Sequence, residues 1–256
     1  MATPEIHQFP CLKDNYGVLL RDPVSGVVAA IDAPNGDEVA AALKAKGWKL
    51  THILTTQRHG DHTDGNLSLK AATGCTIIGP KGEADQVPGI DTAVAEGETF
   101  KLGSLEVRVL ETPGHTKGHI SYWIPSAEVA FVGDTLFALG CGRVFEGSME
   151  QMWTSLAKLA ALPPATRVYC GHEYTLANAK FALTIEPENA ALQTRVKEIE
   201  AKRAKGETTL PTTIGVELET NPFLRAKSPA IRKRLGLESA PDWQVFGEVR
   251  ERKNKS

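Results

Sequence analysis

The stretch Thr55-Thr56-Gln57-Arg58-His59-Gly60-Asp61-His62-Thr63-Asp64-Gly65-Asn66 decides the fold of this chain. It follows the apolar run Ile53-Leu54 and precedes a segment with the pattern of a helix. Two imidazoles and a carboxylate fall within the four residues His59 to His62. In a regular strand or helix they would point in different directions, so we expect them to converge from a tight loop. Imidazole and carboxylate suit zinc, iron or manganese. A polar surface loop rich in turn-forming residues is the alternative for this stretch taken alone.

The length and composition of the chain limit the number of domains, the kinds of partner and the compartment that we expect. The chain has 256 residues, enough for one large domain or a domain with a small appendage. A net charge of -2 gives no general attraction to nucleic acid or to an anionic membrane. No apolar run approaches the ~18 residues that span a bilayer, and the first residues lack a secretory signal. We therefore expect a monomer in the cytoplasm, or in a matrix-like compartment if a transit peptide was trimmed, with no nucleic-acid or membrane partner.

The cysteines are widely spaced and form no C-x-x-C pair, which argues against a disulfide framework. They are Cys11, Cys75, Cys141 and Cys170. We expect small buried residues at all four positions. The alternative applies to Cys141, which lies between two glycines and could line a site.

Apolar runs and turn residues predict the order of the elements. Residues 27–80 alternate strand, helix, strand, helix and strand, which favours an α/β region with ligands beyond the carboxyl ends of the strands. Residues 91–112 and 121–132 show the alternation of antiparallel strands. Together these patterns predict two sheets packed face to face with helices outside.

The character of the chain changes near residue 173. Ser148 and Gln151 form a capping box at the start of a helix that ends before Pro163-Pro164. After residue 173, helices are expected at 176–185, 190–205 and 230–235, and strand patterns nearly vanish. We predict a catalytic domain over 1–173 and a small helical domain over 174–256. Its many Lys and Arg residues favour a solvated helix face, since no aromatics are interleaved with them.

Three further sites resemble the opening stretch, because each places a ligand-type residue after a strand and a glycine. They are Gly114-His115, Gly133-Asp134 and Gly171-His172. Each alone is weak, but strand ends at one edge of a sheet converge in space. His7 and His52 lack this context and are expected to be structural or at the surface. His119 is expected to support the site by hydrogen bonding.

With these motifs the chain resembles the metallo-β-lactamase-fold hydrolases and, among them, the glyoxalase II (hydroxyacylglutathione hydrolase) family. The superfamily signature T-H-x-H-x-D-H corresponds to Thr56 to His62, and the Gly-His, Gly-Asp and Gly-His sites follow it. The narrower resemblance rests on the stretches 12–16, 140–147, 171–175 and 220–225, so that it covers nearly the whole chain. The helical tail separates this family from its fold relatives.

The resemblance implies an α+β fold, a four-layer αββα sandwich followed by a small helical domain that binds glutathione. It implies up to two zinc ions, with iron or manganese as alternatives. The implied metal ligands are His59, Asp61, His62, His115, Asp134 and His172. In the family pattern the first metal takes positions 57, 59 and 115, the second takes Asp61, His62 and His172, and Asp134 bridges them. Asp61 and Asp134 are the implied catalytic residues.

The implied reaction is hydrolysis of an S-2-hydroxyacylglutathione such as S-D-lactoylglutathione, which yields glutathione and D-lactate as the second step of methylglyoxal detoxification. A metal-activated hydroxide attacks the thioester, and a thiol with a pKa near ~8.5 leaves without a strong general acid. The implied substrate-binding residues are Arg143, Val144, Phe145, His172, Tyr174, Arg225 and Lys227. The two arginines suit carboxylate recognition because guanidinium binds a carboxylate in bidentate fashion.

The chain departs from the family pattern at Gln57, where the signature has His, and at Asp64, where the family often has Gly. A neutral amide is a weaker donor than imidazole, so we expect a weakened first metal site. A two-metal enzyme with a Gln ligand, a one-metal enzyme and a weakly active paralogue that binds glutathione conjugates all stay open. A lactonase, a β-lactamase or a persulfide dioxygenase on the same fold is the other alternative, and the helical tail argues against the dioxygenases.

Overall fold

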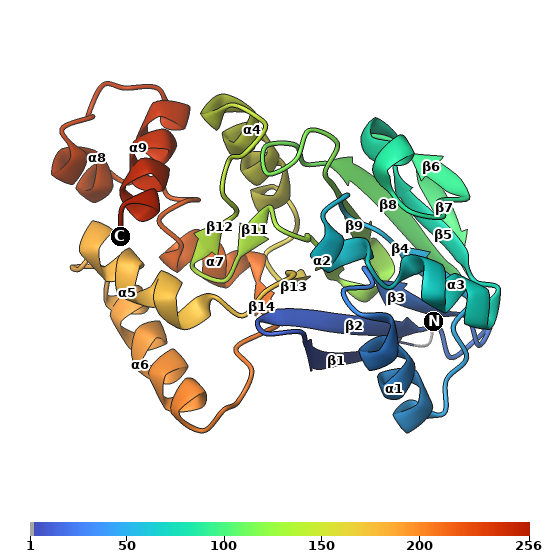
Figure 1. Ribbon diagram of the computed structural model, residues 1–256. Coiled ribbons are helices and arrows are strands. Elements are labelled where there is room, and N and C mark those ends of the chain that lie inside the picture. Colours follow the sequence, from blue (N-terminus) through green and yellow to red (C-terminus); the bar gives the residue numbers. More distant parts are fainter. Residues whose placement is uncertain (1–2) are drawn as a thin grey trace. The chain divides into compact units, whose positions relative to one another are not determined.

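The computed structural model describes residues 3–256, and the chain divides into two compact units (Figure 1). The first unit comprises the chain up to Glu111 together with Thr116–Gly133, and the second comprises Thr112–His115 together with Asp134–Ser256. This division by contacts does not coincide with the boundary expected near residue 173, which stays a prediction.

The first unit contains two sheets. The first sheet is six-stranded, in the order β1 (Glu5–Cys11), β2 (Asn15–Arg21), β3 (Val28–Ile31), β4 (His52–Leu54), β5 (Thr76–Pro80) and β6 (Thr92–Val94). The second runs in the order β10 (Val129–Phe131), β9 (Ile120–Ile124), β8 (Leu105–Glu111) and β7 (Thr99–Leu102) within this unit. Its helical segments are α1 (Gly36–Lys46), α2 (Gly60–Thr63), α3 (Asn66–Thr73), η1 (Lys81–Gln86) and η2 (Pro125–Ala127).

The predicted strand–helix alternation is confirmed in the first sheet. β1, β2 and β3 pair antiparallel, whereas β3, β4, β5 and β6 pair in parallel. The crossover helix α1 begins where the side chain of Asn35 accepts hydrogen bonds from the N–H groups of Asp37 and Glu38. It ends at Gly47, whose φ of 66° is left-handed. Parallel pairing places the carboxyl ends of β3, β4 and β5 along one edge of the sheet.

Both faces of the first sheet are covered within the unit. One face packs against α1 and α3 through an apolar core that includes Val39, Leu43 and Leu69 (Figure 1). On the other side, the hydroxyl of Tyr122 on β9 donates to the carbonyl oxygens of Thr55 at 2.8 Å and Ile78 at 3.3 Å. The second sheet therefore lies against the face opposite the helices, as the sequence pattern predicts.

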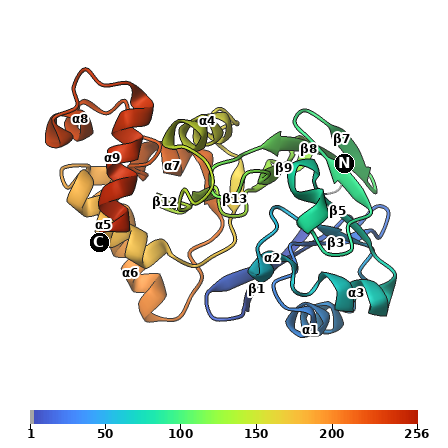
Figure 2. The same cartoon turned by 45° about the horizontal axis from the view of Figure 1, so that its top comes forward.

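The second unit is mainly helical. Its elements are β11 (Leu136–Phe137), β12 (Gly140–Cys141), α4 (Met149–Ala160), β13 (Arg167–Tyr169), α5 (Thr175–Ile185), α6 (Ala190–Ala204), β14 (Thr212–Thr213), α7 (Ile214–Thr220), α8 (Pro229–Leu235) and α9 (Asp242–Asn254). The capping box of Ser148 and Gln151 is present at the start of α4. Helices α5 and α6 lie side by side (Figure 2), and Leu139 packs between them in an apolar cluster. Among residues 3–256, no helix combines the length and apolar character needed to cross a bilayer.

Candidate functional site

In the first unit, the predicted ligands follow β4, beside a carboxylate at the end of β3. Asp32 accepts hydrogen bonds from the backbone N–H of Thr56 at 2.7 Å and from its hydroxyl at 2.8 Å. The second oxygen of Asp32 also lies 2.8 Å from Nδ1 of His62. Asp32 adopts a left-handed φ of 57° and is buried, so the backbone itself aims this carboxylate at the loop after β4.

The bond to Asp32 fixes the tautomer of His62. A carboxylate only accepts, so Nδ1 of His62 carries the proton and Nε2 offers a lone pair. That Nε2 atom lies 3.7 Å from Oδ2 of Asp61. The amide of Asn15 donates to the Asp61 carbonyl oxygen at 3.0 Å and to its carboxylate at 3.2 Å. Both predicted ligands are thus oriented by neighbours, an arrangement found at metal sites.

Glu83, in η1 just after β5, holds the same loop in place, and the sequence analysis did not predict this role. Its buried carboxylate accepts from the backbone N–H of Arg58 at 3.0 Å and of Gly118 at 2.8 Å. One side chain thereby ties the loop that follows β4 to the loop that precedes β9. The only sequence signal was a glutamate just after a strand, which is common on surfaces.

Gln57 lies in the same loop and is completely buried. Neither its amide oxygen nor its amide nitrogen has a hydrogen-bond partner within residues 3–256. A buried amide without partners costs free energy comparable to lost hydrogen bonds. His59, the next predicted ligand, precedes α2 at its N-cap position. Asp64, by contrast, is exposed, so a supporting role for it stays a prediction.

The second unit brings together the remaining three predicted ligands. Nε2 of His115 and Nε2 of His172 each lie 3.3 Å from the same oxygen of Asp134. All three side chains are buried. Nδ1 of His115 lies 3.0 Å from the carbonyl oxygen of Arg143, which only accepts, so the proton is on Nδ1 and Nε2 presents a lone pair to the carboxylate. A lone pair facing a carboxylate oxygen suits a cation shared between them.

Gly142 belongs to the stretch 140–147, which begins Gly-Cys-Gly-Arg and is one of those that carry the family resemblance. A Cβ atom on this residue would lie 1.9 Å from the carbonyl oxygen of Asp134 and 3.2 Å from Nδ1 of His115. Only glycine therefore fits at this position. The backbone can then pass close enough for the next residue, Arg143, to place its carbonyl at His115.

Predicted substrate-binding aromatics flank these ligands. Phe145 is exposed and its ring centroid lies 5.2 Å from that of His115. Tyr174 is partly exposed and stacks on His172, with centroids 4.8 Å apart and planes at 4°. Phe137 meets both rings of that pair edge-on. Val144, the remaining predicted residue of this stretch, is partly buried.

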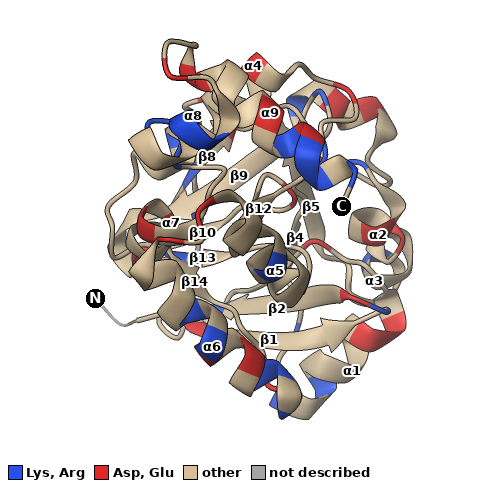
Figure 3. Ribbon diagram, turned by 90° about the vertical axis from the view of Figure 1, so that its left-hand side faces the viewer, with Lys and Arg blue, Asp and Glu red and all other residues tan. Residues whose placement is uncertain are grey.

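Three cations gather in the second unit, and the sequence pointed to only one of them, Arg143. The pKa of Lys253 is lowered by its burial and by the neighbouring charges of Arg250 and Arg143. Arg250 is buried, donates to the carbonyl oxygen of Cys141 at 2.9 Å and lies over the ring of Phe223. No carboxylate within residues 3–256 forms an ion pair with Arg250 in the structure. Basic residues also mark α8 and α9 in Figure 3.

Arg225 and Lys227, predicted to bind substrate, are placed differently. Nε and Nη2 of Arg225 donate to the two carboxylate oxygens of Glu186 at 2.7 and 2.9 Å, and Nη1 donates to the carbonyl oxygen of Leu218. The bidentate face of this guanidinium is therefore used within the protein. The side chain of Lys227 is 83% exposed, and its ammonium nitrogen lies 3.9 Å from a carboxylate oxygen of Asp242. Neither residue belongs to the cation cluster.

The donor set fits a divalent metal. Each unit presents imidazole Nε2 atoms next to carboxylate oxygens, with the Nδ1 proton of His62 and of His115 held by an acceptor. That combination of ligand atom and orienting partner is typical of zinc and related ions. The buried amide of Gln57, which lacks a partner in the described chain, adds one neutral oxygen donor.

Comparisons with known proteins agree with this chemistry. Residues 12–172 match the metallo-β-lactamase superfamily, and residues 173–256 match the C-terminal region of hydroxyacylglutathione hydrolases. The chain is 56% identical over 250 residues to the hydroxyacylglutathione hydrolase of Methylococcus capsulatus, covering 98% of each chain. It is also 56% identical over 254 residues to that of Rhizobium meliloti, covering 99% of each. A crystal structure of ETHE1 from Myxococcus xanthus superimposes with a TM-score of 0.67 at 27% identity, covering 96% of each chain.

The fold and the ligand motifs define a metallo-β-lactamase-fold protein, which implies binding of divalent metal. Within that superfamily, the chain belongs to the hydroxyacylglutathione hydrolase (glyoxalase II) family. It is thus an enzyme of the thioester hydrolase class. The predicted fold class and reaction class are confirmed, and the residue assignments of the site stay predictions.

Proposed function

We propose that this enzyme hydrolyses S-2-hydroxyacylglutathione thioesters, with S-D-lactoylglutathione as substrate and glutathione and D-lactate as products. The observation that carries the choice of a glutathione thioester is the buried guanidinium of Arg250, which has no carboxylate partner among residues 3–256 and lies near Arg143 and Lys253. A buried cation without a counter-charge is costly. The two carboxylates of glutathione supply the missing charge.

We propose as metal ligands the six residues with imidazole or carboxylate donors. They are His59, Asp61, His62, His115, Asp134 and His172. When bound, a divalent metal lowers the pKa of a water molecule and polarises the thioester carbonyl. Zinc is the proposed metal, and Gln57 weakens one of two sites because an amide is a poorer donor than imidazole. The buried amide of Gln57, which has no hydrogen-bond partner among residues 3–256, supports this part.

The chain's own residues orient these groups and bind the substrate. Asp32 keeps the proton of His62 on Nδ1, and the Arg143 carbonyl does the same for His115. Phe145 and Tyr174 offer exposed aromatic surface beside the ligands for the acyl and cysteinyl parts of the thioester. The glutathione thiol has a pKa near ~8.5 in water, so it leaves as the thiolate without a protonated side chain.

Two thioesters that share the acyl group test this proposal. S-D-lactoylglutathione carries two carboxylates, whereas S-D-lactoyl-N-acetylcysteamine carries none. We expect the wild-type enzyme to prefer the first in kcat/KM by about 100-fold, since two charge-assisted contacts are at stake. Equal kcat/KM for both thioesters would contradict recognition of glutathione by the cation cluster.

Arg250 gives the sharper form of the test. Arg250→Met should raise KM for S-D-lactoylglutathione about tenfold and leave hydrolysis of the cysteamine thioester nearly unchanged. Arg250→Lys keeps the charge and serves as the matched control, with an intermediate KM. An equal loss on both thioesters would show that Arg250 only supports the fold.

The cytoplasmic location and the monomeric state expected from the sequence stay predictions.

A further inference from the structure

Glu217 on α7 is a completely buried carboxylate that the proposed chemistry does not use. One of its oxygens accepts from the hydroxyl of Thr212 at 2.6 Å and from Nη2 of Arg195. The other accepts from the amide of Asn221 at 2.9 Å and from the backbone N–H of Leu139 at 2.9 Å. Glu217 therefore accepts from four donors, and one of them, Arg195, is also its counter-charge. Another, the N–H of Leu139, belongs to the β11–β12 hairpin.

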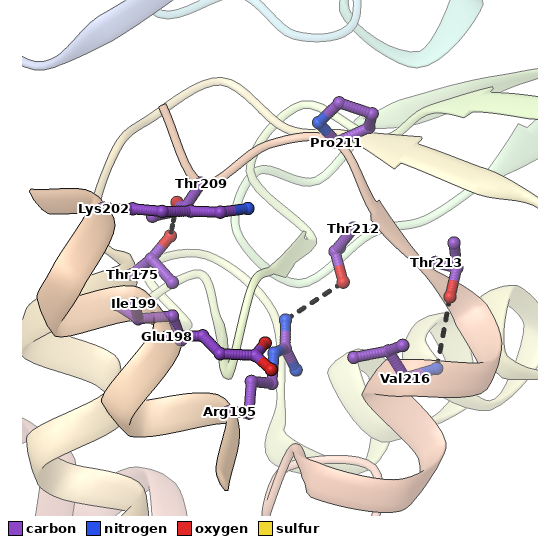
Figure 4. A pocket seen from close by; sticks show the side chains of 10 residues that line it. All are labelled: Thr175, Arg195, Glu198, Ile199, Lys202, Thr209, Pro211, Thr212, Thr213 and Val216. Atoms are coloured by element: carbon purple, nitrogen blue, oxygen red, sulfur yellow. Dashed lines mark hydrogen bonds between the residues drawn. The ribbon is translucent and has the colours of Figure 1, made fainter. Parts of the chain in front are cut away.

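Arg195 reaches this carboxylate from α6. In Figure 4 its guanidinium lies beside a pocket of about 190 Å³ and bonds Thr212 on β14. The side chain of Arg195 is 11% exposed and that of Glu217 is not exposed, so the pair is buried. Of the two residues, Arg195 lines the pocket. Buried pairs of this kind contribute little net stability, because the cost of desolvating the two charges offsets their attraction.

The backbone group that Glu217 holds is in an unusual conformation. Leu139 is buried and has a φ of 57°, in the left-handed region that leucine rarely adopts. It is the second residue of the two-residue loop between β11 and β12, where Phe137 pairs with Gly140. Such a conformation is strained for leucine and persists only where the surroundings impose it.

The same hairpin is held at further points. The amide of Asn221 also donates to the carbonyl oxygens of Phe137 at 3.2 Å and Gly140 at 3.0 Å. The amide of Asn178 donates to the carbonyl oxygen of Ala138 at 3.1 Å. These bonds hold carbonyl groups, whereas Glu217 alone accepts from the N–H of the left-handed residue.

The β11–β12 hairpin contacts the candidate site through the ring of Phe137. Its ring meets His172 edge-on at 6.0 Å and Tyr174 edge-on at 5.5 Å, with both interplanar angles at 88°. Edge-to-face contacts at these distances are attractive and directional. A shift of Phe137 would therefore loosen the side chain of Tyr174 where it stacks on His172.

We propose that Glu217 is a positioning residue for substrate binding. Its carboxylate holds Leu139 in the left-handed conformation, the hairpin thereby keeps Phe137 edge-on, and Phe137 fixes Tyr174 on His172. Arg195 supplies the counter-charge of this buried carboxylate. The kinetic part of this inference rests on the proposed function.

Two double variants separate the effect of the hydrogen-bond acceptor at position 217 from the effect of the Arg195–Glu217 ion pair. Arg195→Met/Glu217→Gln and Arg195→Met/Glu217→Met both remove the ion pair, so neither leaves an unpaired charge in the core. Only the first retains an oxygen that can accept from the N–H of Leu139. We expect the Gln variant to keep the wild-type KM for S-D-lactoylglutathione within about twofold. The Met variant should raise KM about tenfold, with kcat and metal content per chain unchanged.

A spectroscopic readout separates this inference from the proposed function. The near-ultraviolet circular dichroism of Tyr174 is obtained as the difference between a protein and its Tyr174→Phe form. This difference should persist in the Gln variant and fall by at least half in the Met variant, whether or not the thioester is the true substrate. If the enzyme did not hydrolyse the thioester, the proposed function would be wrong. The circular dichroism of Tyr174 would still test the positioning role of Glu217.

Two results would overturn the positioning role. The first is the same KM and the same Tyr174 signal in the Gln and Met variants. The second comes from Phe137→Leu, which leaves Glu217 and Arg195 in place and serves if the Met variant does not fold. That variant should show the tenfold rise in KM and the loss of the Tyr174 signal. Wild-type values for both would refute the step in which Phe137 fixes Tyr174 on His172.

Discussion

Gln57 occupies the position at which the signature T-H-x-H-x-D-H has its first histidine. It is fully buried and its amide has no hydrogen-bond partner in the described residues, so its present surroundings do not compensate for its desolvation. An imidazole at this position would bind a metal more strongly than a neutral amide oxygen does. We therefore expect the glutamine to lower the affinity of one metal site and to leave the other donors in place.

Gln57→His should restore the stronger donor. We expect the variant to bind its second metal equivalent about tenfold more tightly, the scale on which single changes around a metal act. Titration of chelator-stripped protein with zinc, followed by calorimetry and elemental analysis, measures this without any substrate. Two tightly bound equivalents in the wild-type protein, or no gain in the variant, would contradict the assigned weakness.

The cysteines illustrate a second effect of burial. Burial raises the pKa of Cys11 to about 12, with help from a hydrogen bond to Glu38, and raises that of Cys141 to about 11. Burial also raises the pKa of Cys170. All four thiols are buried and free, as the spacing predicted, and thiolate is the reactive form.

A thiol count with a disulfide reagent at pH 8 should therefore find few reactive groups in the native protein. All four should react once the protein is unfolded in guanidinium chloride. The measurement is the absorbance of the released thiolate over several minutes. Rapid native reaction of Cys141 would revive the alternative that it lines an open site.

At the level of elements, the hairpin between β2 and β3 depends on Asp22. Burial alone would raise the pKa of this carboxyl, but bonds from the Ser25 hydroxyl and from the N–H groups of Ser104 and Val24 outweigh it and lower the pKa. A depressed folded-state pKa stabilises the protein above the unfolded value of 3.8. That contribution is lost as the pH falls through the folded value.

Asp22→Asn should reduce the free energy of unfolding by about 2 kcal/mol at pH 7, because bonds to an ionised group are replaced by weaker ones. The difference between wild type and variant should shrink below pH 4, where the unfolded state takes up the proton. Urea unfolding at pH 7 and at pH 3.5 measures both values. A difference that does not depend on pH would rule out the charge as the cause.

Elements with long regular patterns could be predicted from the sequence, and short ones could not. The β3–α1–β4–α3–β5 alternation followed from apolar runs, from Gly47 and from the turn residues between them. The β11–β12 hairpin has strands of two residues each, too short to show alternation. Its left-handed Leu139 also lacks the glycine that would mark a turn.

The candidate metal ligands could be predicted because each follows a strand and a glycine or lies in the signature motif. The basic residues could not be sorted in the same way. Arg225 has the guanidinium group of a carboxylate-binding residue. The carboxylate that it binds in the structure is that of Glu186, which lies 39 positions away in the chain, so the pairing is not visible in the sequence. Arg250 and Lys253 lie one helical turn apart in a run of charges that resembles a solvated helix face. Only tertiary packing shows that Arg250 is buried.

For the whole molecule, the central claim is that this chain is a metal-dependent hydrolase of glutathione thioesters. The most direct measurement is hydrolysis of S-D-lactoylglutathione by the purified full-length protein, followed at the loss of thioester absorbance. It is carried out after removal of metal by a chelator and again after addition of zinc, iron or manganese. We predict no turnover by the stripped protein, recovery with at least one metal and release of one glutathione per thioester. Absence of turnover with every metal would contradict the account.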